Sequence, residues 1–160
     1  MDEKVLREKI MGCWLGKAVG GTLGQPYEGN LGPLNLEFYN PVPDDMIPND
    51  DLDLQVLWAC VMDKMDKPVV DRKVFGKAWL ENVNFPWDEY GVCIRNLRNG
   101  IMPPFSGSHD NWFVDGMGAA IRSEIWACIA PGNPKLAAAY SYEDACTDHD
   151  GDGIYAEMFL

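Results

Sequence analysis

The sequence predicts an all-α protein, a compact multi-helix bundle with long loops that line a cleft. Apolar residues recur three and four positions apart in several segments, which is the spacing of a helix with one buried face. Clusters of glycine and proline separate these segments, and no stretch alternates apolar and polar residues as a strand does. The length of 160 residues, 47% of them hydrophobic, suits one domain over residues 1–160.

The first half of the chain predicts three helices. Residues 3–19 carry the helical spacing, with glycines at every fourth position that favour close packing of helices. Residues 24–49 are rich in glycine, proline and asparagine and form a loop. A second helix is capped by Asn49 and ends near residue 66, before Pro68, and a third covers 69–82.

The second half predicts a long loop and then three more helices. Residues 84–115 contain repeated Pro and Gly signals and are expected to be loop, of the length that often carries a site. Helices follow over 116–130 and 135–146, and the last begins after Gly153. This last helix reaches Leu160 without a stop signal, so we expect the chain to be truncated at its C-terminus, the N-terminal portion of a longer protein.

Charge and composition exclude several functions. The chain has 13 basic and 25 acidic residues, a net charge of −12, which repels a nucleic-acid backbone. The longest apolar run has seven residues, far below the roughly 18 of a membrane span. The five cysteines are odd in number and form no Cys-x-x-Cys pair, which favours buried, reduced thiols in a cytoplasmic protein.

Asn49-Asp50-Asp51-Leu52-Asp53 concentrates an amide and three carboxylates at the start of a predicted helix. Hard cations such as Mg²⁺ prefer oxygen ligands of this kind. The same residues would also serve as an ordinary helix cap followed by acids that favour the helix dipole. The local sequence leaves both interpretations open.

Two further motifs are less specific. Residues 148–153 match the first half of a calcium-binding EF-hand loop, but the twelfth position, which should be a glutamate, is Phe159. Gly116 and Gly118 precede a predicted helix and could present backbone N–H groups to an anion such as a pyrophosphate. The alternative for these glycines is close helix packing.

Taken in order, four motifs resemble the ADP-ribosylglycohydrolase family, the DraG-like hydrolases. The first runs from Gly12 to Glu28, where the family has a helix, Gly-Asp-x-x-Gly and a glutamate. Asn49-Asp50-Asp51 is similar to the metal-binding Thr-Asp-Asp of the family, and residues 116–122 to its Gly-Asn-Gly-Ala-Ala-Met-Arg. Asp148-His149 resembles its Thr-His pair.

This resemblance implies an all-α fold and a binuclear Mg²⁺ (or Mn²⁺) centre in a cleft. It implies metal ligation by Asn49, Asp50 and Asp51, and catalytic roles for Glu28 and Asp51. It also implies substrate binding by Gly116, Gly118, Ala119 and His149, with the glycines facing the diphosphate and His149 bordering the ribose.

The implied function is metal-dependent hydrolysis of the N- or O-glycosidic bond at C1″ of ADP-ribose attached to a protein or a small molecule. Gly21 and Asn49 stand where the family has aspartate and threonine, which motivates the alternative of a degenerate ADP-ribose or nucleotide binder. A calcium-binding module is a third, weaker possibility. The second metal motif of the family, Asp-x-Asp-Thr, is absent, so these residues resemble its N-terminal half to two-thirds. On their own they should bind metal weakly and turn over slowly or not at all.

Overall fold

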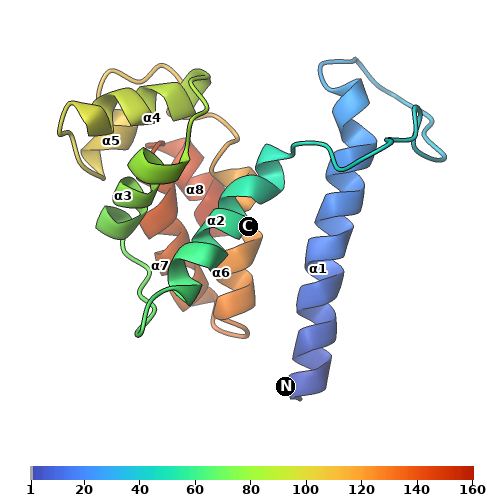
Figure 1. The fold of residues 1–160 in the computed structure, drawn as a ribbon, viewed down its shortest axis with the longest axis horizontal. Coiled ribbons are helices and arrows are strands. Elements are labelled where there is room, and N and C mark those ends of the chain that lie inside the picture. Colours follow the sequence, from blue (N-terminus) through green and yellow to red (C-terminus); the bar gives the residue numbers. More distant parts are fainter. Residues whose placement is uncertain (1) are drawn as a thin grey trace. The chain divides into compact units, whose positions relative to one another are not determined.

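The computed structural model describes residues 2–160, and these are helical with no β-strand, which confirms the predicted fold class (Figure 1). The helices are α1 (Glu3–Gly24), α2 (Asp50–Asp63), α3 (Arg72–Asn82), α4 (Asp88–Arg98), α5 (Phe105–Ser108), α6 (Glu124–Ile129), α7 (Pro134–Ala145) and α8 (Asp152–Phe159). Two short 3₁₀ helices, η1 (Gln25–Tyr27) and η2 (Ala120–Arg122), complete them. The chain divides into two compact units, residues 1–54 and 55–160, described in turn below.

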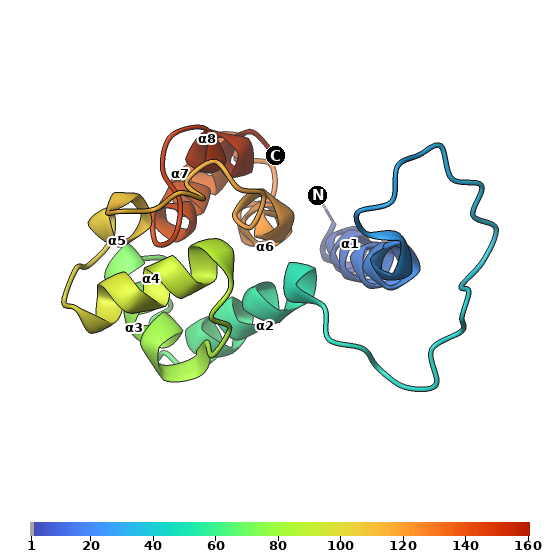
Figure 2. The same ribbon diagram turned by 90° about the horizontal axis from the view of Figure 1, so that it is seen from above.

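The first unit is a long helix followed by an extended segment. The Asp2 carboxylate caps α1 by accepting the N–H of Lys4 at 2.8 Å, and the helix runs on to Gly24, five residues beyond the predicted end. None of residues 3–24 is buried. Residues 28–49 hold no helix, as predicted, and form a wide arc (Figure 2). The Gln25 amide donates to the Pro48 carbonyl at 3.2 Å, which ties the end of the arc to its start.

An aromatic cluster forms the core of the second unit. Trp58, Phe75, Trp79 and Trp126 are all fully buried. Ring centroids lie 4.6 Å apart between Trp58 and Phe75, and 5.4 Å apart between Phe75 and Trp126, which is the range of attractive aromatic pairs. The core therefore joins α2, α3 and α6, while α7 packs on α8 and α4 on α5 (Figure 1).

The prediction that residues 84–115 are loop is wrong for α4 and α5. Within α4 the residues at 90, 93, 94 and 97 are buried, which is the spacing of one helical face. Acids occupy its first turn and Arg95 and Arg98 its last, as the helix dipole favours. Pro86 and Asn99-Gly100 therefore flank a helix and do not interrupt it.

The single helix predicted over 116–130 is also wrong. The structure has a turn, then η2, then the short helix α6. The buried guanidinium of Arg122 donates to the Gly118 carbonyl at 2.9 Å, so a side chain takes up a backbone acceptor at the start of this segment.

The remaining expectations on composition concern cysteines and membranes. All five cysteines are free thiols, but only Cys93 and Cys146 are buried, and Cys60 is exposed, so the prediction of burial fails there. Across residues 2–160, no helix combines the length and apolar character that crossing a bilayer requires.

Candidate functional site

The predicted site residues fall into two groups, one in each compact unit. Glu28 and the Asn49-Asp50-Asp51 motif belong to residues 1–54. Gly116, Gly118, Ala119 and His149 belong to residues 55–160. Each group is therefore considered by its own geometry.

The acidic motif begins α2 as predicted. The backbone carbonyl of Asn49 accepts the N–H of Asp53 at 2.9 Å, so Asn49 occupies the cap position. Asp50 is exposed and Asp51 half-buried, while Glu28 is exposed directly after η1. Burial, and then the charge of Asp50, raises the pKa of Asp53.

The oxygen donors of this motif suit a hard cation such as Mg²⁺, but they are few. Among the residues that the structure describes, no three or more His, Cys, Asp or Glu side chains come close enough to hold a metal ion together.

Gly21 and Asn49, the two departures from the family pattern, lie against each other. A Cβ built on Gly21 would overlap the Asn49 side-chain nitrogen and would lie 3.2 Å from Asn49 Cγ. An aspartate at position 21 therefore has no room beside Asn49 as it stands. The two departures are therefore in direct contact.

In the second unit, His149 is fully buried at the meeting point of four glycines. A Cβ on Gly116 would lie 3.4 Å from His149 Nε2, and one on Gly118 would lie 3.2 Å from His149 Cε1. A Cβ on Gly153 would meet the ring at 2.8 Å, and one on Gly107 would overlap the His149 backbone. The structure thus brings together three of the predicted positions, Gly116, Gly118 and His149.

Ala119, the fourth predicted position, follows directly and is also fully buried. Its side chain belongs to an apolar cluster with Ala145, Cys146 and Ile154. The turn formed by residues 116–118 is called the glycine turn below. Ala119 therefore fixes the glycine turn to α7 and α8 through packing.

The buried side chain of Arg122 contacts the backbone of the glycine turn. It donates to the Gly118 carbonyl, to both carboxylate oxygens of Asp148 at 2.9 and 2.5 Å, and to Asp144 at 3.1 Å. All three charged side chains are fully buried. Burial alone would raise the pKa of Asp148, but Arg122 and His149 together hold it below its usual range. The cluster is thus a buried ion-pair network that fixes the turn against α7.

Glu89 completes the group, and the sequence interpretation did not include it. It lies in the first turn of α4, and its Oε1 is 3.8 Å from His149 Nε2. Its side chain is 15% exposed, whereas that of His149 is fully buried. Burial raises the pKa of this carboxyl. Helical spacing within residues 88–98 was the signal that could have drawn attention to it.

The calcium-binding motif does not form a calcium site. Asp148, the first ligand position, is paired with Arg122. The Asp150 carboxylate accepts the N–H of Gly151 at 2.9 Å, which is a local turn contact. Glu157 is fully buried on α8, neither carboxyl oxygen has a hydrogen-bond partner, and burial raises its pKa well above its usual range.

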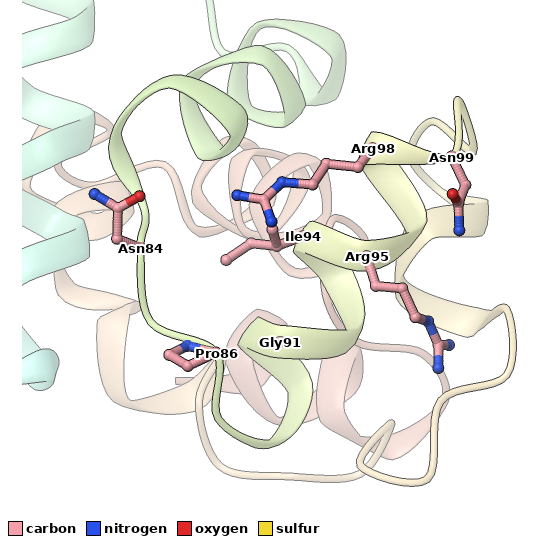
Figure 3. Close-up of a pocket in the computed structure, with 7 residues that line it drawn as sticks. All are labelled: Asn84, Pro86, Gly91, Ile94, Arg95, Arg98 and Asn99. Carbon is pink, nitrogen blue, oxygen red and sulfur yellow. The ribbon is translucent and has the colours of Figure 1, made fainter.

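A separate hollow of about 370 Å³ lies along α4. The Arg98 guanidinium extends over Ile94 toward Asn84, while Arg95 points away and pairs with Asp110 at 3.4 Å (Figure 3). None of the predicted site residues lines it; its lining is Asn84, Pro86, Gly91, Ile94, Arg95, Arg98 and Asn99.

The all-helical fold is the one that the resemblance to the helical glycosyl hydrolases implies. The family model described as ADP-ribosylglycohydrolase matches residues 2–160, and the chain therefore belongs to this family. At family level this supports a glycohydrolase of ADP-ribose conjugates. Comparisons with curated proteins and with solved structures gave no match.

Proposed function

We propose that this chain contributes to metal-dependent hydrolysis of the glycosidic bond at C1″ of ADP-ribose joined to a protein or a small molecule. The observation that carries the proposal is the convergence of Gly116, Gly118 and His149, which lie 33 or fewer residues apart in sequence and meet at one point of the fold. The family match over residues 2–160 supports the same assignment.

Asn49, Asp50 and Asp51 would hold Mg²⁺ or Mn²⁺ in this proposal, as part of a centre that is binuclear in complete relatives. A bound divalent ion would orient a water molecule and the ribose hydroxyls. Glu28 or Asp51 would accept the proton that the attacking water loses, and this proton would pass to the departing nitrogen or oxygen as its bond to C1″ breaks. The small number of protein donors at this motif supports weak metal binding.

The substrate side of the proposal assigns the ligand to Gly116, Gly118, Ala119 and His149. Because Gly118, Ala119 and His149 are buried, direct contact would fall on Gly116, which is half-buried, with the other three residues shaping the turn. The five free cysteines support a cytoplasmic location for this activity.

A calorimetric titration of ADP-ribose, in Mg²⁺ and then in excess EDTA, tests the proposal, together with an assay for ADP-ribose release from a conjugate. We expect binding that weakens in EDTA, and in the double variant Asp50→Asn with Asp51→Asn we expect the difference between the two buffers to disappear. Asp44→Asn with Asp45→Asn, an exposed acid pair in the same unit, is the matched control. Absence of ADP-ribose binding in Mg²⁺ would overturn the proposal.

The contact between Gly21 and Asn49 favours a second candidate, a protein that binds ADP-ribose without cleaving it. Gly21 stands where the family has an aspartate, which removes a negative charge, and the neutral amide of Asn49 stands where the family has a threonine hydroxyl. Binding with no release of ADP-ribose at saturating Mg²⁺ would select this candidate.

A further inference from the structure

A second hollow, of about 280 Å³, is lined by residues of α5, α7 and α8 and by none of the predicted site residues. Each of these helices contributes one aromatic side chain to it, which are Phe105, Tyr142 and Tyr155. Phe105 and Tyr155 are 68% and 64% exposed, and Tyr142 is half-buried. Aromatic rings of this size are normally covered in a folded protein, so their ring faces are available to a ligand.

The charge at this hollow is negative. Asp150 is the one charged residue in its lining, and no lysine or arginine of the described chain contributes to it. The backbone N–H of Asp150 donates to the Val114 carbonyl at 3.2 Å, which fixes this residue in place. Within residues 2–160, the Asp150 carboxylate accepts a single hydrogen bond, from the N–H of Gly151 at 2.9 Å. One carboxylate oxygen therefore remains for a ligand, and the net charge of −12 attracts cations to it.

The same unit already holds one guanidinium group with a ring and a carboxylate. The centre of the Arg72 guanidinium lies 4.9 Å from the centroid of the Tyr142 ring. Its Nε–H donates to the Glu143 carboxylate at 2.8 Å. A planar guanidinium can thus stack on a ring while its N–H groups reach a carboxylate. Arg72 has its counter-ion in Glu143, whereas Asp150 is paired with no cation of residues 2–160.

Other ligands suit the hollow less well. An anion would be repelled by the Asp150 carboxylate. A neutral ring would cover this carboxylate without donating a hydrogen bond, which is costly for a charged group. A metal ion needs several oxygen donors, and no group of three or more His, Cys, Asp or Glu in the described chain could hold one. An organic cation with N–H groups satisfies both the rings and the carboxylate.

The exposure of the rings favours a ligand that is part of a larger surface. Sites for small molecules usually enclose most of the ligand. Here the walls formed by Phe105 and Tyr155 are mostly exposed, so a small ion would keep much of its surface in water. A side chain carried by a protein would bring neighbouring residues into contact with these rings.

We propose that this hollow binds the guanidinium group of an arginine side chain on a protein partner. Phe105 and Tyr155 offer their ring faces to the guanidinium, and the Asp150 carboxylate accepts its N–H groups. This docking site does not depend on the proposed function, because its residues and those of the predicted site are different.

The first test titrates the whole chain with the peptide acetyl-Gly-Arg-Gly-amide while the amide NMR signals of Gly151 and Tyr155 are followed. The same peptide with citrulline, a neutral isostere of arginine, controls for charge, and methylguanidinium represents a free small cation. We expect the arginine peptide to move both signals, methylguanidinium to bind more weakly, and the citrulline peptide to move neither. No response to the arginine peptide, an equal response to citrulline, or tighter binding of methylguanidinium would overturn the inference.

The second test repeats the arginine-peptide titration with matched variants. Asp150→Asn should weaken binding about tenfold, the size of a lost hydrogen bond between charged groups, whereas Asp63→Asn, at an exposed acid on α2, should not. Tyr155→Leu should weaken binding about threefold and Tyr155→Phe should retain it, because the ring face makes the contact. Phe159→Leu removes an exposed ring of α8 that lies outside the hollow, and should have no effect. Equal losses in the variants and their controls, or unchanged binding in Asp150→Asn and Tyr155→Leu, would contradict the assignment.

Discussion

Replacing Asp144 by alanine should destabilise the second unit more than any surface substitution. The Asp144 carboxylate is fully buried and accepts hydrogen bonds from the indole nitrogens of Trp58 and Trp126, each at 3.1 Å. It also accepts the Nε–H of Arg122 at 3.1 Å. One side chain thus satisfies three donors from α2, α6 and η2.

The size of the effect follows from these contacts. Breaking a buried ion pair by removing one partner costs about 3–5 kcal/mol, because the other charge is left without compensation. Each indole N–H that loses its acceptor costs at most about 1–3 kcal/mol more. The total is smaller than this sum because Asp148 still pairs with Arg122 and compensates its charge. We expect a loss of about 4 kcal/mol, which lowers the melting temperature by roughly 10 °C or more.

Thermal and urea unfolding followed by circular dichroism measure this loss. Asp144→Asn keeps one carbonyl acceptor and should lose about half as much. Asp63→Ala, at an exposed position near the end of α2, should stay within about 0.5 kcal/mol of the wild type. A loss below about 1 kcal/mol for Asp144→Ala would show that the buried network does not stabilise the fold in the way inferred here.

Two further predictions concern Glu157 and the contact between Gly21 and Asn49. Because burial raises the pKa of Glu157, the stability it contributes is complete below the ordinary glutamate pKa and is lost as the pH rises toward the folded-state value. Glu157→Gln does not titrate, so its free energy of unfolding relative to the wild type should rise with pH above the ordinary glutamate pKa, by up to about 1.4 kcal/mol per pH unit in urea titrations; a constant difference would contradict this. Gly21→Ala should stabilise α1 by less than the roughly 1 kcal/mol that helix propensity gives alanine, because its Cβ must displace the Asn49 side-chain amide, and by more once Asn49→Thr is present. A thermal-unfolding cycle should give a coupling of about 1 kcal/mol, and equal effects of Gly21→Ala in both backgrounds would refute the contact.

The local sequence predicted correctly the helices that are capped by their own neighbouring side chains. The predicted ends of the third helix and of the helix over 135–146 lie within three residues of α3 and α7, because Asp71 and Asn133 cap them through their own side chains. The all-α class and the family were also predictable, since each rests on patterns that a single segment or an ordered set of motifs displays. The catalytic and metal-binding roles of Glu28, Asn49, Asp50 and Asp51 stay predictions.

The buried network was not predictable because its members are distant in sequence. Asp148 reads locally as a calcium ligand, yet its partner Arg122 lies 26 positions earlier. Glu89 reaches Gly118 and His149 only because α4 folds back onto the glycine turn. No periodicity within a segment encodes a contact of this kind, and the dense prolines and glycines on either side of α4 obscured the helix itself.

The aromatic core also determines the intrinsic tryptophan fluorescence of the protein. Trp58, Trp79 and Trp126 are fully shielded within residues 55–160, whereas Trp87 and Trp112 are 64% and 90% exposed. Residues 1–54 carry one tryptophan, the half-buried Trp14 on α1. A red shift in intrinsic fluorescence therefore reports mainly the opening of the second unit, and the first can melt almost unseen. With Trp14→Phe as the reference, the difference between the two emission curves isolates the unit that carries the acidic motif.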